Sequence, residues 1–325
     1  MSGGMGGSEL APLRALLDRH VVGHDQAKAA LLLGLVCREH VYLEGPPGSA
    51  KTRMAEIAAR GSELDFFFYQ MHRDTRLAEL VGDVVLERRP LQAGPGDPEA
   101  RGERIHQKIE PGGLLLAQVC VLDDISRAPG EALNVLLRIL NERKFGDAPI
   151  PLLSASATSN PMRDEYYNEP LDPANLDRFG LQLSVEGLVG SGEPELARSL
   201  LDRFVDGEVE EQPLLEPVCD RGLFDRLFAR LGKVPVPEPV RQALLQFLQT
   251  LVRDYDCNET NALLTDRSFL VKSVKLFRGS ALMAGREAVA AEDLDVLRWM
   301  TTFRVPEEVH ARVPEILERV KEKCG

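Results

Sequence analysis

The amino-acid sequence predicts an α/β protein whose parallel β-sheet is flanked by helices and followed by a smaller, all-helical domain. Three observations support this prediction. Between residues 9 and 187, short apolar segments with β propensity alternate with helical patterns, which is typical of a parallel sheet with helices on both faces. A loop rich in glycine and proline joins one of these strands directly to a helix. From residue 193 to 325, helical periodicity continues almost throughout.

The elements of the α/β domain (residues 9–187) can be placed in chain order from the spacing of apolar residues. We expect helices at 9–20, 26–37, 52–60 and 129–143, and strands at 40–44, 65–70, 119–122, 152–158 and 179–185. The stretch 88–110 is rich in proline, glycine and charge, which predicts an exposed inserted loop or hairpin. In the helical lid domain (residues 193–325) we expect helices at 196–204, 223–231, 240–255, 268–284 and 291–302.

Composition and charge exclude several classes of protein. The 51 acidic and 39 basic residues give a formal charge of −12, which disfavours broad binding to nucleic acid because such binding requires clustered lysine and arginine. The five cysteines are scattered and form no CxxC pair, which argues against a disulfide framework or a zinc site. The sequence contains neither a signal-peptide pattern nor an apolar run of the ~18 residues that a membrane span requires. We therefore expect a soluble, cytoplasmic protein.

The glycine- and proline-rich loop lies between a β-prone segment and a helix, which is the context of a phosphate-binding loop. Successive backbone N–H groups and a helix N-terminus would bind phosphate oxygens there, while the lysine reaches the β- and γ-phosphates and the threonine hydroxyl holds Mg²⁺. These residues predict ATP and Mg²⁺ as ligands. The loop consists of Gly45, Pro46, Pro47, Gly48, Ser49, Ala50, Lys51 and Thr52. Ala50 stands where glycine is usual, so we expect this loop to bind phosphate if the φ angle of Ala50 is negative.

Two aspartates follow the apolar strand at 119–122, about seventy residues after the loop. In a protein with such a loop, Asp123 would complete the Mg²⁺ shell and Asp124 would polarise the attacking water. The second position is more often glutamate, and the shorter Asp124 raises the question of how efficiently ATP is hydrolysed. The alternative is that the two aspartates only end a strand and open a turn.

Two further polar residues are candidates for the same site. Asn160 follows the next apolar strand, where an amide beside the γ-phosphate could orient the water, although Asn-Pro is also an ordinary turn signal. Arg178, in the sequence Leu-Asp-Arg-Phe-Gly, could act as an arginine finger. It could instead cap a helix or pair with Asp177.

These residues carry a family resemblance. The chain resembles the MoxR-type AAA+ ATPases, with its closest likeness to the RavA branch, in which Ala50 looks like the usual variant. The resemblance covers residues 9–187 well and the helical domain more loosely. The segment 176–180 is also similar to the arginine-finger segment of the small ATPase subunit of magnesium chelatase. The matching segments are 22–25, 45–52, 121–128, 136–145, 157–161 and 176–180.

The resemblance implies a homo-oligomeric, hexameric ring with nucleotide bound between subunits. It implies that Asn160 is the sensor-1 residue and that Arg178 is a finger acting on the neighbour's ATP. Arg267 would be the sensor-2 residue, although its segment could equally be an ordinary helix cap. Val22 and His24 would lie near the adenine. The insertion at 88–110 would face the ring pore, where its basic residues either engage a client or lie in a solvated loop; these are Arg101, Arg104, His106 and Lys108.

Together these observations predict an ATP-hydrolysing, chaperone-like remodelling ATPase of the MoxR type. It would act on a protein partner, which by resemblance is expected to carry a von Willebrand A domain, or it would assist cofactor or metal insertion. One alternative is a nucleotide-gated scaffold with little turnover. Others are an AAA+ motor acting on nucleic acid and a subunit like that of magnesium chelatase. The sequence identifies neither the client nor the number of subunits.

Overall fold

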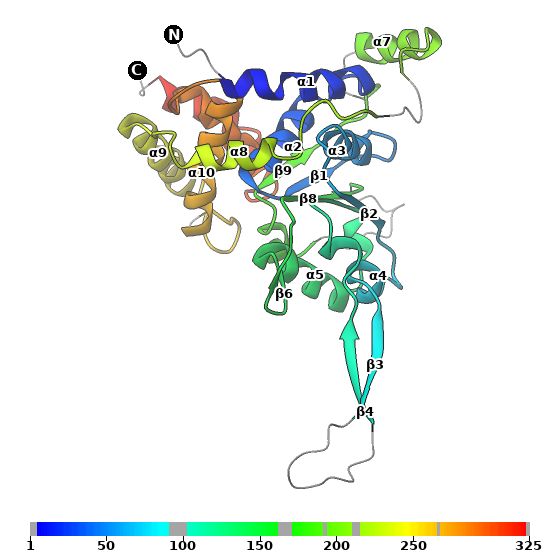
Figure 1. The fold of residues 1–325 in the computed structure, drawn as a ribbon. Coiled ribbons are helices and arrows are strands. Elements are labelled where there is room, and N and C mark those ends of the chain that lie inside the picture. The colour runs from blue at the N-terminus through cyan, green and yellow to red at the C-terminus, as the bar shows by residue number, and fades with distance from the viewer. Residues whose placement is uncertain are drawn as a thin grey trace.

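The computed structural model describes residues 5–90, 103–161, 171–190, 194–209, 215–264 and 267–322. At its centre is a five-stranded sheet with the strand order β2-β5-β8-β1-β9 (Figure 1). All four neighbouring pairs are parallel. The predicted α/β fold class is therefore confirmed. The strands are β1 Val41–Glu44, β2 Phe66–Gln70, β5 Val119–Asp123, β8 Ser154–Ser159 and β9 Leu181–Ser184.

Helices cover both faces of this sheet because alternate residues along each strand point to opposite sides. Val41 and Leu43 of β1 belong to a hydrophobic cluster with helices α1 Met5–His20, α2 Asp25–Cys37 and α3 Lys51–Arg60. Tyr42, between them, belongs to a second cluster with α4 Leu77–Val81 and α5 Gly130–Glu142. The central strand β8 is buried along its whole length and is built only from Ser, Ala and Thr, which is consistent with close packing on both sides.

The stretch expected to be a loop or hairpin forms an antiparallel pair, β3 Val84–Pro90 and β4 Glu103–Ile109, that projects from the core (Figure 1). It begins at Val84 rather than at residue 88. Gly82 precedes it with a φ of 108°, and a Cβ there would collide with the Glu110 carbonyl oxygen, so only glycine fits this position. Arg104, His106 and Lys108 lie on β4, whereas Arg101 lies outside the described residues. A second short pair is formed by β6 Lys144–Phe145 and β7 Ala148–Pro149.

The C-terminal part of the chain is helical, as expected. Helices α8 and α10 pack on α2, α10 also contacts α1, and α11 contacts β9, so this lid covers one side and one edge of the core. The helix expected at 291–302 is a 3₁₀ segment, Ala291–Asp295, followed by α11, and the short helices α12 and α13 were not predicted. The lid helices are α8 Leu223–Leu231, α9 Glu238–Asp254, α10 Arg267–Met283, α11 Val296–Thr301, α12 Glu307–His310 and α13 Val313–Lys321.

Helix α7 Pro194–Val205 differs from these lid helices, because none of its residues is buried. It lies beside α1 (Figure 1), where the Arg203 guanidinium donates hydrogen bonds to the carbonyl oxygens of Asp18 and Arg19. The domain bounds 9–187 and 193–325 remain predictions. Within the described ranges, no helix has both the length and the hydropathy needed to cross a membrane.

Candidate nucleotide site

The candidate site, called the strand-end site below, lies where three neighbouring parallel strands end. The phosphate loop follows β1, Asp123 and Asp124 follow β5, and Asn160 follows β8. Because β8 lies between β5 and β1, all three strand ends meet at the same edge of the sheet, which is where ligands bind in open α/β folds. The backbone N–H of Gly45 donates a hydrogen bond of 3.0 Å to the Ser159 carbonyl oxygen and ties the loop to the end of β8.

The loop adopts two left-handed backbone conformations. Gly48 has a φ of 80° and Ala50 a φ of 57°. Ala50 therefore does not meet the condition, a negative φ, under which we expected the loop to bind phosphate. A left-handed residue just before a helix turns the following N–H groups toward an anion, so the geometry itself requires this angle. For an alanine the conformation costs roughly 1–2 kcal/mol relative to the right-handed one.

Lys51 begins α3 and is buried in the loop that precedes it. Its Nζ donates hydrogen bonds of 2.8 Å to the carbonyl oxygens of Gly45 and Pro46, and it lies 3.3 Å from the Ser49 hydroxyl. Burial lowers the pKa of Lys51, and the charge of Asp123 partly opposes that effect. The ammonium group is thus held inside the loop, with the nearby carboxylates favouring its charged form.

The two residues predicted to bind Mg²⁺, Thr52 and Asp123, contact each other. The Thr52 hydroxyl donates a hydrogen bond of 3.1 Å to Asp123 Oδ1, and the Thr158 hydroxyl donates to the same oxygen. A hydroxyl and one carboxylate fit Mg²⁺, which usually binds one or two carboxylates together with waters and substrate phosphates. In the described part of the chain, no cluster of three His, Cys, Asp or Glu side chains could hold a metal by itself. Mg²⁺ would therefore be held together with the nucleotide.

Asp124 is anchored from several sides and is more than the end of a strand. Its backbone has a φ of 52°, and its N–H donates to Thr158 Oγ1 over 3.2 Å. Asn160 Nδ2 donates to Asp124 Oδ1 over 2.9 Å, and Arg127 Nη1 lies 3.3 Å from Oδ2. Burial raises the pKa of the Asp124 carboxyl, although the Arg127 charge lowers it. The result is a buried carboxylate in contact with the predicted sensor amide, which is suited to accept a proton or orient a water.

Sequence reasoning missed the supporting roles of Thr158 and Arg127. Thr158 connects the two aspartates, because its hydroxyl bonds both the Asp123 side chain and the Asp124 backbone. A signal was present in each case. Polar residues alternate along a strand that is otherwise built of alanine, and an arginine three residues after an aspartate can reach it across one helical turn.

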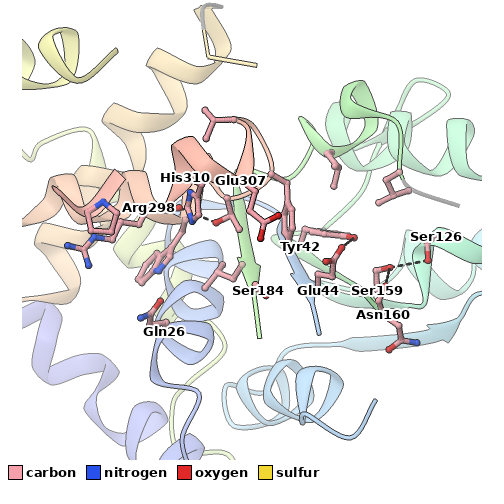
Figure 2. A pocket seen from close by; sticks show the side chains of 18 residues that line it. Gln26, Tyr42, Glu44, Ser126, Ser159, Asn160, Ser184, Arg298, Glu307 and His310 are labelled. Atoms are coloured by element: carbon pink, nitrogen blue, oxygen red, sulfur yellow. Dashed lines mark hydrogen bonds between the residues drawn. The ribbon is translucent and has the colours of Figure 1, made fainter. Parts of the chain in front are cut away.

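A cavity of about 760 Å³ lies next to this site, between the core and the lid (Figure 2). Asn160 lines it and also contacts Asp124, so this amide lies between the strand-end site and the cavity. No residue of the phosphate loop lines it. The core contributes Tyr42, Glu44, Ser126 and Ser159 to its wall, and the lid contributes Arg298, Trp299, Phe303, Glu307 and His310.

The other predicted site residues lie outside this cluster of contacts. Val22 is buried, and His24 precedes α2 with a φ of 57°. Burial lowers the pKa of His24, and the Lys51 charge contributes to that shift, so His24 lies near the loop. Arg178 lies in the turn after α6 Pro173–Leu176, and Arg267 is exposed at the first position of α10. Among the described residues, no hydrogen bond or ion pair joins either arginine to the phosphate loop.

Comparison with known families matches both parts of the chain. The family described as AAA domain (dynein-related subfamily) matches residues 40–179, and an AAA lid domain matches residues 243–311. The first match contains every residue of the strand-end site. The second contains helix α10 and helix α11, which bound the lid side of the molecule.

Two relatives match part of the chain. The chain is 31% identical over 198 residues to Chaperone MoxR1 of Mycobacterium tuberculosis, a match that covers 59% of this chain and 47% of that protein. It is 27% identical over 201 residues to Protein MoxR of Paracoccus denitrificans, covering 59% of this chain and 54% of that protein. The chain thus matches about half the length of each relative.

A solved structure shares the whole architecture. The crystal structure of a candidate ATPase from Cytophaga hutchinsonii matches with a TM-score of 0.73 and 20% sequence identity, and the match covers 98% of this chain and 94% of that one. At this identity the likeness establishes the fold alone. It extends over the α/β core and the helical lid together.

Proposed function

We propose that this chain is a MoxR-type AAA+ ATPase that binds ATP with Mg²⁺ at residues 45–52 and hydrolyses it to ADP and phosphate. It would use this cycle to remodel a protein partner. One observation carries the proposal. The ends of three strands bring a buried lysine, a hydroxyl–carboxylate pair and a buried carboxylate–amide pair to one edge of the sheet. This is the set of groups that phosphoryl transfer to water requires.

Each residue has a distinct task in this proposal. ATP would supply the transferred γ-phosphoryl group, and Mg²⁺ would neutralise its developing charge. Lys51 binds the β- and γ-phosphates, and Thr52 with Asp123 holds the metal. Asp124 orients the attacking water and accepts its proton, while Asn160 fixes the position of that carboxylate. The hydrogen bond between the Asn160 amide and Asp124 supports this division of labour.

The arginine finger would come from a neighbouring subunit of a homo-oligomeric ring, which we propose to be hexameric. Arg178 makes no hydrogen bond or ion pair with the phosphate loop of its own chain in the described residues. Its Nε is buried without a hydrogen-bond partner there, so the guanidinium is not committed to a structural contact on that side. A planar, permanently charged group suits the charge that spreads over a transferring phosphoryl group.

The finer assignments have more limited support. Arg267 is proposed as the sensor-2 residue because it begins α10 and is exposed. Val22 and His24 are proposed to lie near the adenine on the basis of the family resemblance. The assignment to the RavA branch and the domain bounds 9–187 and 193–325 rest on the sequence pattern.

The partner is proposed to be a protein, and the cytoplasm is the proposed compartment. The name of the M. tuberculosis relative, Chaperone MoxR1, supports a chaperone-like role. A partner with a von Willebrand A domain, or a role in cofactor or metal insertion, rests on the family resemblance. The projecting hairpin β3–β4 is a candidate surface for client binding because it extends away from the core (Figure 1).

Replacing Lys51 with alanine tests the nucleotide site. The change removes the charge and the three loop contacts of Nζ, and the affinity for ATP should fall by roughly 10–100-fold. Titration with a fluorescent ATP analogue measures this, and Lys233→Ala, an exposed lysine after α8, is the matched control. An unchanged affinity in Lys51→Ala would contradict the assignment of residues 45–52.

The alternative of a nucleotide-gated scaffold has one observation in its favour. Both oxygens of the short Asp124 carboxylate are already engaged, by Asn160 and by Arg127. Steady-state turnover distinguishes the two functions, because a scaffold would bind ATP normally and release almost no phosphate. The net charge of −12 gives no comparable support to a motor on nucleic acid.

A further inference from the structure

The segment that carries Arg178 is held by the lid rather than by the core alone. This finger segment, residues 176–180, begins at the last residue of the four-residue helix α6 and ends just before β9. The carbonyl oxygens of this segment accept hydrogen bonds from side-chain donors elsewhere in the chain. Gln182 supplies some of them from the core, because its Nε2 donates to the carbonyl oxygens of Leu176 and Phe179 over 2.8 and 3.2 Å.

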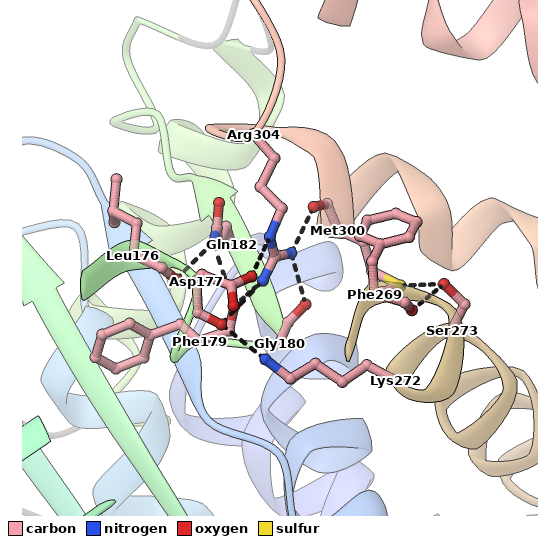
Figure 3. Close-up of polar contacts among 10 residues, drawn as sticks. All are labelled: Leu176, Asp177, Phe179, Gly180, Gln182, Phe269, Lys272, Ser273, Met300 and Arg304. Carbon is pink, nitrogen blue, oxygen red and sulfur yellow. Dashed lines mark hydrogen bonds and ion pairs between the residues drawn. The ribbon is translucent and has the colours of Figure 1, made fainter. Parts of the chain in front are cut away.

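Arg304, which follows α11, supplies most of the remaining donors (Figure 3). Its guanidinium donates to the carbonyl oxygen of Phe179 over 2.8 Å, of Asp177 over 3.3 Å and of Gly180 over 3.4 Å. It also pairs with the Asp177 carboxylate over 3.2 Å. Only 2% of Arg304 is exposed, and it is among the largest fully buried side chains of the described residues. A buried charge of this kind is costly unless it is fully paired, and here the finger segment provides the pairing.

Helix α10 places two more cations, Lys272 and Lys275, near the finger segment. Lys272 Nζ donates to the Asp177 carbonyl oxygen over 2.7 Å. Lys275 forms an ion pair with Glu39, and the Glu39 side chain packs against Gly180, where an added Cβ would lie 2.7 Å from Glu39 Oε2. The Phe269 ring lies 5.8 Å from the guanidinium of Arg304. Helix α10 and the residue Arg304 after α11 therefore contact the finger segment from the lid side.

The same lid elements carry the proposed sensor-2 residue and part of the wall of the cavity beside Asn160. Helix α10 begins at Arg267, the proposed sensor-2 residue, five positions before Lys272. Helix α11 lines the cavity beside Asn160, with Arg298 and Trp299, and ends three residues before Arg304. A change in the angle between the lid and the core would therefore move the donors that fix the finger segment.

We propose that Arg304 and Lys272 are positioning residues for the arginine finger, so that the lid of one subunit sets the placement of Arg178 at the ATP of the next. This inference rests on the proposed role of Arg178 in the neighbour's site. The lid then carries information between subunits: a ligand that shifts it in one subunit changes hydrolysis in the adjacent one. Neither residue touches nucleotide itself.

Arg304→Gln is the first test, because it removes the charge and most of the donors. The value of kcat should fall by roughly 10²-fold, the size of effect expected from a misplaced catalytic group, with the affinity for ATP nearly unchanged. Subunit mixing then locates the defect. An Arg304→Gln subunit has an intact ATP site and a misplaced finger, so Asp124→Asn subunits, which have an intact finger, should restore activity to the mixture. Arg178→Ala subunits should not, because both variants lack a functional finger.

A second variant and a control distinguish a misplaced finger from a misfolded lid. Lys272→Met keeps the aliphatic stem and removes one hydrogen bond of a partly exposed residue, so it should fold and should show the same mixing pattern with a smaller loss, roughly tenfold. Arg286→Gln breaks an ion pair with the buried Asp293 inside the lid and destabilises the lid without touching the finger segment. Its kcat should stay close to that of the parent protein at temperatures where the lid is folded. Circular dichroism monitors folding of all three variants.

The outcomes separate this inference from the proposed function. If Arg178→Ala and Asp124→Asn fail to restore each other, the finger does not act between subunits, and the proposed function is wrong on that point. If they do, but Arg304→Gln and Lys272→Met are restored by Arg178→Ala instead of by Asp124→Asn, the two residues act on their own subunit's site. That result would overturn the positioning role, as would a parental kcat in both folded variants.

Discussion

The strand-end site and the finger segment are held in different ways. The strand-end site is assembled within the core, by hydrogen bonds between residues that follow neighbouring strands, such as Thr52 to Asp123 and Asn160 to Asp124. The finger segment takes much of its support from another domain, through Arg304 and Lys272. In the proposed ring, a subunit's own site would be held by its core, whereas the placement of the finger for a neighbour would depend on the position of the lid.

The backbones of the two regions differ as well. The strand-end site uses left-handed residues, Ala50 and Asp124, whose unusual φ angles are fixed by the surrounding turns. Among the described non-glycine residues with positive φ, none belongs to the segment 176–180. Its shape depends on hydrogen bonds to its carbonyl groups instead. The finger segment can therefore shift when the donors to its carbonyl groups shift. The turns at Ala50 and Asp124 are fixed by their own backbone conformation instead.

Replacing Arg178 with alanine should produce the largest effect and sharpen this comparison. Loss of an arginine finger lowers kcat by ~10³–10⁵-fold while ground-state binding changes little. We expect ATP titration to give nearly the parental affinity and phosphate release to be very slow. Arg138→Ala, an exposed arginine on α5, is the matched control. A large loss of ATP affinity in Arg178→Ala would place this residue in its own subunit's site.

Replacing Asp124 with asparagine should have the next largest effect, because the amide keeps the shape but cannot accept a proton. Removal of a general base typically costs ~10²–10⁴-fold in rate. ATP binding should persist, because Lys51, Thr52 and Asp123 remain. Asp147→Asn, in the exposed turn between β6 and β7, serves as the control. Hydrolysis at the parental rate would mean that Asp124 is structural and that Asp123 is the only functional acid.

The pH dependence of kcat tests the same carboxylate. Burial raises the pKa of Asp124 above its usual value, and only the deprotonated form can act as a base. Turnover should therefore be retained above the raised pKa and lost as the pH falls through it, at a higher pH than an ordinary aspartate would give. The acidic limb of the profile should disappear from the residual activity of Asp124→Asn. A limb that persists unchanged would report a different group.

Replacing Ala50 with glycine should have the smallest effect. Glycine relieves the left-handed strain of roughly 1–2 kcal/mol, but it also increases the entropy of the unfolded chain by about 0.4–1 kcal/mol. The free energy of unfolding should rise by about 0–1.6 kcal/mol, as measured by urea denaturation, and ATP affinity should be kept. A fall of more than about 1 kcal/mol would show that packing of the Ala50 methyl group against the core outweighs the strain.

The sequence could place the candidate residues of the strand-end site together because its signals are local. The loop 45–52 is contiguous, and Asp123, Asp124 and Asn160 each follow an apolar strand, so a parallel sheet necessarily brings them to one edge. The fold class and most helices follow from periodicity alone. A negative φ at Ala50 was set as the condition for phosphate binding because the size of the side chain suggested it, whereas the turn gives this residue a positive φ.

The residues that hold the finger segment, Arg304 and Lys272, could not be predicted from local sequence signals. Arg304 follows a short helix and is 127 positions from Asp177, and nothing in its neighbourhood distinguishes it from an ordinary surface arginine. Its burial depends on how the lid packs on the core, which is a tertiary property. Helices α12 and α13 were not predicted, although each begins beside a proline, Pro306 or Pro314, at a position where proline is tolerated.

The steady-state ATPase rate of a mixture of Arg178→Ala and Asp124→Asn subunits tests the central claim most directly. Each variant alone should be nearly inactive, because one lacks a finger for its neighbour and the other lacks a base. A mixed ring contains interfaces in which an intact Arg178 faces an intact Asp124, so the mixture should regain a measurable part of the parental rate. If subunits exchange, as followed by energy transfer between labelled chains, and the rate still does not exceed that of the separate variants, the finger does not act between subunits.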